Sequence, residues 1–392
     1  MLREERNLYI SNFNMNFKLK FPVVFYPILL AFSLFLLDKI FFLPVVVENT
    51  YSWKKIERKF YELKEDLFEV MLEERRKNPS KQIGLILGSS RSGEFDSKML
   101  ESFFPNTNSF NFAAPFGPPS FQAYWLERSI QAKLPLRYVL IEVDPLLFSQ
   151  SAIEYSLNGS YDNEYVLKQI DFYRMKTKNP WLAEAKGFSM DEVEVYFLKK
   201  LFALYKYPLD PTAIKANNKE IEVGFFPGMS VGITGKDHKR NYIDKIKLVN
   251  RVKFGALPNE IKFANMDVFL ERDAEAMYNQ YLRGTKLAPT QIYFFKKMLD
   301  LLKGTGIPVI IYFPAVSDAL RRRMSTDGLL EGFNGEIRKA VAHASQVPNS
   351  KFTVVDPNSD PRWVCKDFVD SLHLSGACFP NLLPILFPKE IR

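Results

Sequence analysis

The chain has 392 residues, of which 47% are hydrophobic and 25% are charged, and its formal net charge is +8. This composition excludes an intrinsically disordered chain and provides enough apolar side chains for a sizeable core. The positive charge suits anionic partners such as membrane surfaces or envelope polymers. No nucleic-acid-binding motif accompanies it, so we expect no nucleic-acid partner. The only two cysteines, Cys365 and Cys378, exclude a disulfide-rich scaffold and a zinc site built from paired CxxC motifs.

The N-terminal region predicts a membrane anchor. No charged residue occurs between Phe21 and Leu37, which is close to the minimum length for a helix that crosses the ~30 Å hydrocarbon core of a bilayer. Asp38 and Lys39 interrupt the apolar run, which then resumes. We therefore expect a tail at residues 1–20 and one long, tilted transmembrane helix at residues 21–47. The alternative is a cleaved signal peptide, which the length of the run and the absence of an A-x-A site disfavour.

The charges around this segment give a weak signal for orientation, because basic residues flank both of its ends. Lys18 and Lys20 lie closest to the apolar run, and they favour a cytoplasmic N-terminus with an exported body. We expect a single-pass protein of the cell membrane whose main domain is extracytoplasmic.

The residues after the predicted anchor indicate an α/β domain. Apolar residues at three- and four-residue steps predict an amphipathic connecting helix within residues 48–78. Helical patterns alternate with five short apolar runs, which predicts a doubly wound parallel sheet flanked by helices, at residues 79–150 and 285–392. The five predicted strands are Ile83–Leu87, Phe110–Ala113, Tyr138–Val143, Pro308–Phe313 and Phe352–Val355.

The alternation of strands and helices breaks down between residues 151 and 284, which we interpret as an insertion of helices and loops. Within it, residues 209–262 are rich in Lys, Asn, Gly and Pro and show no clear period. A basic run from Lys236 to Lys253 would contact an anionic substrate or lipid headgroups, or form a solvated surface loop.

Two short motifs carry candidate chemistry. The sequence "GSSRSG" follows the first predicted strand, and "DSLH" follows the last one. A nucleophilic serine needs a base to accept its proton, and that base needs a third group to orient it. Asp370 and His373 are three residues apart, so a helical turn would place both on one face. Because both motifs follow strand ends of one parallel sheet, their side chains can converge.

Together the motifs resemble the SGNH (GDSL-like) hydrolase superfamily, which carries its nucleophile after the first strand and an Asp-x-x-His block near the C-terminus. The resemblance implies that Ser90 is the nucleophile, His373 the base and Asp370 its orienting group, without a metal or an organic cofactor. It also implies an oxyanion hole from the Ser90 N–H and from Gly117 in "NFAAPFG". Arg91 and Asn111 are candidate substrate-binding residues.

One block of the family is missing. The sequence "IEVDP" at Ile141–Pro145 occupies the place of Gly-x-Asn-Asp, with Asp144 where an amide is expected. This removes one expected oxyanion donor, and such a loss costs about 3–4 kcal/mol of transition-state stabilisation. Ser92 is the alternative to Ser90 as the reactive hydroxyl. For Arg91, the alternative to substrate binding is a surface salt bridge.

With its anchor, the chain resembles a narrower group that includes the D-alanyl-transfer protein of lipoteichoic acid synthesis and the alginate O-acetylation proteins. That resemblance implies transfer or hydrolysis of an O-acyl ester on an envelope glycan or polymer, with a multi-spanning acyltransferase partner. A non-catalytic envelope scaffold with the same fold is the main alternative, and the anchor disfavours a soluble lipase or esterase.

The two cysteines leave two arrangements open. They bracket the Asp-x-x-His motif, so in an oxidising compartment a bridge between Cys365 and Cys378 would restrain the segment that presents His373. Otherwise they are free, partly buried thiols.

Overall fold

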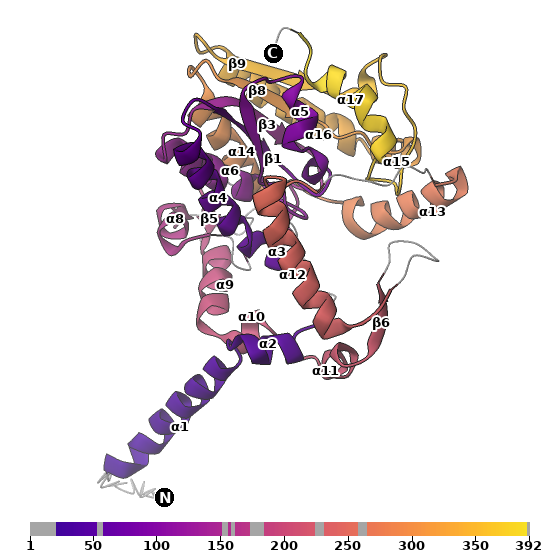
Figure 1. The fold of residues 1–392 in the computed structure, drawn as a ribbon. Helices are drawn as coiled ribbons and strands as arrows, with labels where there is room; N and C mark the ends of the chain where they lie inside the picture. Colours follow the sequence, from indigo (N-terminus) through magenta and orange to yellow (C-terminus); the bar gives the residue numbers. More distant parts are fainter. Residues whose placement is uncertain are drawn as a thin grey trace, which may run out of the picture.

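The computed structural model describes residues 21–52, 58–150, 156–157, 161–172, 184–223, 231–257 and 265–389. Its centre is a five-stranded parallel sheet in the order β2-β1-β3-β8-β9 (Figure 1). The strands are β1 (Gln82–Leu87), β2 (Thr107–Asn111), β3 (Leu136–Glu142), β8 (Pro308–Tyr312) and β9 (Lys351–Val355). All five predicted strands are confirmed, with ends that shift by up to three residues.

This strand order is typical of doubly wound folds. Strand β2 lies on one side of β1, and the chain then crosses over so that β3, β8 and β9 follow on the other side of β1. This order places β1 beside β3, with Leu85 opposite Val139 and Leu87 opposite Ile141. In parallel strands the carboxyl ends meet at one edge of the sheet. The segments after β1 and after β3 are therefore neighbours at the point where ligands bind in such folds.

Helices cover both faces of the sheet because alternate strand residues point to opposite sides. Leu85 and Val139 face a core built with helices α4 (Lys64–Lys77), α6 (Pro119–Gln131), α14 (Pro289–Leu302) and α16 (Leu329–Ser345). Ile86 and Leu140 face a second core built with α5 (Ser97–Glu101) and α17 (Phe379–Leu386). The helical patterns of the sequence correspond to α6, α14 and α16.

The expected connecting helix is present but broken at Leu63 into α3 (Arg58–Glu62) and α4. Its apolar side, including Phe60, Leu67 and Met71, is buried as the spacing predicts. Phe68 packs against Trp125 of α6, with ring centroids 5.7 Å apart. This segment is therefore part of the main core as well as a connection. Residues 53–57, including Ile56, lie outside the described part.

The region of the expected insertion contains helices of varied length and two small sheets. Its helices are α8 (Asn163–Lys168), α9 (Met190–Leu201), α10 (Ala203–Lys206), α11 (Pro211–Asn217), α12 (Gly235–Val252), α13 (Asp267–Met277) and the π-helix η4 (Tyr278–Leu282). Its strands are β4 (Ile170–Asp171), β5 (Phe188–Ser189), β6 (Glu220–Val223) and β7 (Val231–Thr234). The main domain also contains α15 (Asp318–Thr326) and the short 3-10 turns η2 (Ser92–Glu94), η5 (Pro357–Ser359) and η6 (Gly376–Cys378).

The basic run from Lys236 to Lys253 is not a loop, because most of it forms the 18-residue helix α12. Thr234 caps this helix by accepting a hydrogen bond from the Asp237 N–H. Few apolar residues mark its buried side, and polar ones take their place: Asn250 donates to the Leu63 carbonyl at 2.9 Å. A hydrophobic pattern cannot reveal a helix that docks through polar contacts.

The expected continuous helix over residues 21–47 is also wrong. Helix α1 (Phe21–Ile40) ends before a turn, and α2 (Pro44–Thr50) leaves it at an angle of 77°. Pro44 has no N–H with which to continue the helical ladder, so it begins a new helix instead. Within the described residues, no single helix is long and apolar enough to cross a membrane. The bent pair Phe25–Ile40 and Pro44–Thr50 meets that test by length and composition together.

Candidate active site

The hydroxyl cluster after β1 forms a tight loop that exposes one serine and buries two. Ser90 is exposed, whereas Ser89 and Ser92 are buried. Gly88 begins the loop and has no space for a side chain, since a Cβ there would lie 2.5 Å from Glu142 Oε2. The loop geometry therefore selects Ser90 as the accessible hydroxyl.

Glu142, at the end of β3, holds this loop in place. Its fully buried carboxylate accepts hydrogen bonds from the Ser89 N–H at 2.8 Å, the Ser89 hydroxyl at 2.5 Å and the Ser92 hydroxyl at 2.6 Å. The Ser92 oxygen also lies 2.5 Å from the Tyr312 hydroxyl. Both flanking serines are thus engaged internally, and Ser90 lies between them on a restrained backbone.

Arg91 is buried rather than on the surface. Its guanidinium lies 2.9 Å from Glu142 Oε1 and 3.1 Å from Asp144 Oδ2. Burial alone would lower the pKa of Arg91, but the two carboxylates outweigh it and raise that pKa, so the group stays charged. The salt bridges of Arg91 are therefore buried and not at the surface as expected. Asp144 and Pro145 begin a turn after β3, in which the Asp144 carboxylate also accepts from the Leu146 N–H at 2.8 Å.

The Asp-x-x-His motif lies in a short hairpin-like loop, not in the helical turn that the spacing suggested. Phe368 and Leu374 form an isolated antiparallel bridge across it, and the Val369 N–H donates to the His373 carbonyl at 2.9 Å. Inside the loop, Asp370 Oδ1 accepts from the backbone N–H groups of Leu372 at 2.9 Å and of His373 at 2.7 Å. The carboxylate is thereby held toward the imidazole.

The two motifs meet across the edge of the sheet. Ser90 Oγ lies 2.9 Å from His373 Nε2, and His373 Nδ1 lies 2.9 Å from Asp370 Oδ2. A carboxylate only accepts hydrogen bonds, so Nδ1 carries the proton and Nε2 is free to accept from the serine. Burial would raise the pKa of Asp370, but its hydrogen bonds with His373 and the backbone lower it, so the carboxylate is charged at neutral pH.

Asn111 and Gly117 have structural partners. The Asn111 amide, fully buried, donates to the carbonyls of Ser92 at 2.7 Å and Phe95 at 2.9 Å. Its side chain therefore supports the serine loop. The Gly117 N–H donates to the Ala114 carbonyl at 2.8 Å, so it is engaged in a turn instead of open for an oxyanion. No described protein group accepts a hydrogen bond from the Ser90 N–H.

A family model described as "Protein of unknown function (DUF1574)" matches residues 19–389. The chain belongs to this family. No curated protein matches it. The match covers the apolar N-terminal helix, the region between residues 151 and 284, and both motifs. All of these parts of this DUF1574 protein therefore lie within the region that defines the family.

The buried acidic residues were missed by the sequence reasoning. In this DUF1574 protein, Glu142 is the last residue of β3 and Asp144 follows the strand; the sequence marks Asp144 only as a departure from a motif. A charged residue that ends an otherwise apolar strand was the available signal. Glu94 is a further buried acid, and it lines a cavity of about 10 Å³ with Arg91, Tyr312 and Leu372, which has room for about one water molecule. Burial, together with the charges of Asp370 and Glu142, raises the pKa of Glu94 well above its ordinary value.

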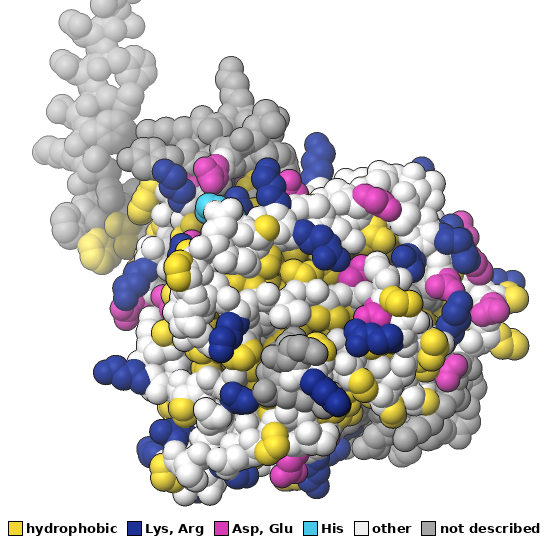
Figure 2. Space-filling view, turned by 90° about the horizontal axis from the view of Figure 1, so that it is seen from above, with side chains coloured by type: hydrophobic (Ala, Val, Ile, Leu, Met, Phe, Trp, Pro, Cys, Tyr) yellow, Lys and Arg dark blue, Asp and Glu magenta, His cyan; other side chains and the backbone are white. Residues whose placement is uncertain are grey.

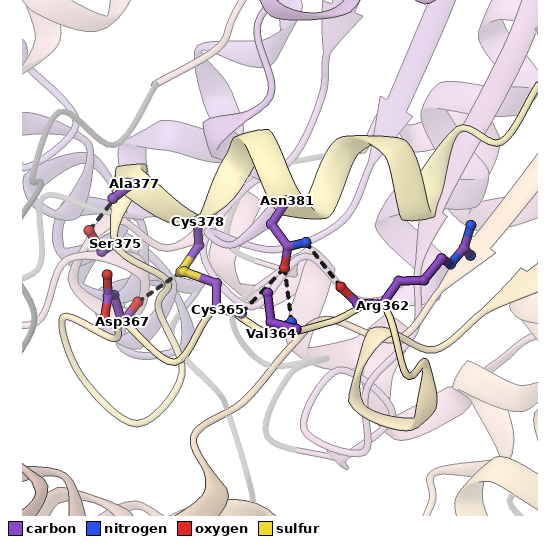
Figure 3. The surroundings of a disulfide bond; sticks show 8 residues. All are labelled: Arg362, Val364, Cys365, Asp367, Ser375, Ala377, Cys378 and Asn381. Carbon is purple, nitrogen blue, oxygen red and sulfur yellow. Dashed lines mark hydrogen bonds between the residues drawn. A yellow bond between two sulfur atoms is a disulfide. The ribbon is translucent and has the colours of Figure 1, made fainter.

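The two cysteines of the DUF1574 chain form a disulfide beside the Asp-x-x-His loop (Figure 3). Their Cα atoms lie 5.5 Å apart. Of the two arrangements that the sequence leaves open, the structure therefore shows the disulfide and not the free thiols. The bridge joins the chain before Asp370 to the start of α17. Asn381 of α17 reinforces the joint by accepting from the N–H groups of Val364 at 3.1 Å and Cys365 at 3.3 Å.

Proposed function

We propose that this protein is a membrane-anchored serine esterase or O-acyltransferase of the SGNH-like type. The single observation that carries the proposal is the hydrogen-bonded series Ser90–His373–Asp370, assembled from motifs 283 residues apart in the chain. An exposed serine whose hydroxyl faces a carboxylate-oriented imidazole is the arrangement that nucleophilic acyl transfer needs.

In the proposed mechanism, Ser90 Oγ attacks the carbonyl carbon of an ester while His373 Nε2 takes the serine proton. Asp370 stabilises the imidazolium that forms. Collapse of the tetrahedral intermediate breaks the ester C–O bond, and His373 returns the proton to the leaving alcohol. Water or an acceptor hydroxyl then attacks the acyl-serine, with His373 again as the base, and this step releases an acid or a new ester.

The oxyanion of the intermediate needs donors aimed at it. We assign this role to the backbone N–H of Ser90. A contribution from Gly117 would require its N–H to leave the Ala114 carbonyl, so we do not include it. The Arg91–Glu142–Asp144 cluster takes a positioning role instead, because it fixes the backbone on both sides of Ser90.

The N-terminal helices and the disulfide support the proposed location. The side chains of α1 from Phe25 to Leu37 are exposed and almost wholly apolar, as expected of a helix in lipid. A disulfide is stable in an oxidising compartment. We therefore propose an extracytoplasmic domain that acts on an O-acyl ester of an envelope glycan or polymer, together with a multi-spanning acyl-carrying partner in the same membrane.

A fluorophosphonate probe tests the catalytic proposal. The detergent-purified full-length protein is expected to be labelled, and Ser90→Ala and His373→Ala are each expected to abolish labelling, because the residues act as a unit. Ser90→Ala removes an exposed hydroxyl and should leave the melting temperature nearly unchanged.

Ser92→Ala is the matched control at the same loop. It removes a buried hydroxyl with two partners, so it should lower the melting temperature while the residual folded protein still labels. Full labelling of Ser90→Ala would refute the assignment of the nucleophile. Absence of labelling in every variant and in the parent would favour the non-catalytic scaffold.

A further inference from the structure

The end of α1 is fastened to the body of the protein by the charged pair Asp38–Lys39. The Asp38 carboxylate accepts hydrogen bonds from the N–H groups of Ala203 at 2.8 Å and Leu204 at 2.9 Å, at the start of α10. Lys39 Nζ lies 3.0 Å from the same carboxylate and donates to the Leu201 carbonyl. The pair therefore joins α1 to the α9–α10 turn through polar contacts at the point where the apolar helix ends.

Helix α2 is held just as firmly on its other side. The Asn217 amide of α11 donates to the Asn49 carbonyl at 2.8 Å, and Lys239 Nζ of α12 donates to the Tyr51 carbonyl at 2.9 Å. Arg240 forms an ion pair with Glu48. Contacts with α10, α11 and α12 thus fix the 77° bend between α1 and α2, and α2, α10 and α11 lie together where α1 leaves the body (Figure 1).

These helices expose apolar side chains at the same end of the molecule. The set, which we call the foot surface, has exposures between 37% and 60% and consists of Leu43, Val45, Leu201, Leu204, Tyr205 and Ile214. A group of exposed apolar side chains such as this indicates a surface that lipid or another apolar partner covers. From the opposite end of the molecule, charged side chains of both signs are spread among the hydrophobic ones (Figure 2).

We infer that the foot surface lies in the headgroup–acyl boundary of the membrane that α1 enters. The inference rests on the proposed membrane anchor, and it deepens that proposal by assigning a second lipid contact to the body itself. Continuity identifies the occupant, because the exposed apolar residues of α1 continue past the buried Asp38, with Ile40 and Leu43 following Leu36 and Leu37. Whatever medium surrounds the end of α1 also reaches the foot surface.

The charge at the rim of the foot surface fits anionic headgroups. Lys200, Lys215 and Lys219 are exposed beside its apolar residues. Lysine side chains next to an apolar surface keep their charge at the level of the headgroups, where each contributes about 1 kcal/mol of attraction to an anionic membrane. Because the joint to α1 is fixed, docking of the foot surface sets the angle at which the whole domain stands on the bilayer.

Depth-dependent quenching tests the inference on the full-length chain in phosphatidylglycerol–phosphatidylcholine vesicles. An environment-sensitive fluorophore is attached, without reductant, to one new cysteine at a time: Leu204→Cys and Ile214→Cys on the foot surface, and Leu34→Cys within α1. Leu167→Cys on α8 is the matched control, because Leu167 is equally apolar and 53% exposed. A shallow spin-labelled lipid should quench positions 204 and 214 at least twofold more than position 167, and a deep one should quench position 34.

The possible failures are distinguishable. If position 34 is quenched while positions 204 and 214 behave like position 167, the anchor stands and the inference is overturned. If position 34 is not quenched either, the proposed anchor fails and the inference with it. A blue-shifted emission at position 204 without quenching by either lipid would mean that a protein surface covers the foot, which also overturns the inference.

Discussion

The substitution Glu142→Ala should test whether the buried carboxylate organises the serine loop. It removes the acceptor for three hydrogen bonds from Ser89 and Ser92 and one of the two carboxylates that neutralise Arg91. Removing one partner of a buried ion pair costs about 3–5 kcal/mol. The orphaned donors contribute to the same loss and are not added to it. We therefore expect the free energy of unfolding to fall by about 3–5 kcal/mol.

The assay is urea unfolding of the full-length protein in detergent, followed by circular dichroism. The midpoint should fall without a change of slope, since the surface exposed on unfolding is the same. Asp144→Ala is the control, because it also removes a carboxylate from Arg91 but leaves both serines bonded to Glu142. In the proposed mechanism, Glu142→Ala should therefore slow labelling of Ser90 more than Asp144→Ala does.

A double-mutant cycle gives the refuting outcome. Once Arg91 is also replaced by alanine, no guanidinium is left unpaired, so the double variant should lose less stability than the sum of the two single variants, by at least about 0.5 kcal/mol. A Glu142→Ala variant within about 0.5 kcal/mol of the parent, or strict additivity, would refute the reasoning.

Three further predictions concern single features of the site. Gly117→Ala should lower the free energy of unfolding by about 1–3 kcal/mol, because the added Cβ would lie 2.2 Å from the Gly88 carbonyl oxygen. Gly93→Ala is the control, because a Cβ there meets nothing within 4 Å. Equal urea midpoints for the two variants would contradict this prediction. Because the folded state raises the pKa of Glu94, the free energy of unfolding falls as the pH rises from the ordinary Glu pKa through the raised one. Glu94→Gln removes this loss, so it should be more stabilising at pH 8 than at pH 4, and a difference independent of pH would sink the idea. Replacing Cys365 and Cys378 by alanine opens a loop with a sequence separation of 13, which should cost about 3 kcal/mol and slow labelling of Ser90; unchanged unfolding of the reduced parent would argue against it.

The sequence by itself determined the five strands of the main sheet and several of the helices that cover it, because their signals are local. The strands β1 and β3 are short, apolar and followed by turn residues, and helices α6, α14 and α16 show a periodic apolar side. It also indicated the Ser90, Asp370 and His373 candidates, since each motif is contained in a few residues.

Only the tertiary structure decided what depends on partners far away in the chain. Strand order places the end of β3 beside the end of β1, and this is why Glu142 reaches Ser89 and Arg91. Asp38 looked like an interruption of an apolar run because the two N–H groups that it caps lie 165 and 166 residues later. Helix α12 docks through Lys239 and Asn250, whose acceptors are the carbonyls of Tyr51 and Leu63. A hydrophobic pattern records which side chains avoid water, but a buried polar group is stable only beside a particular partner, and the fold alone supplies that partner.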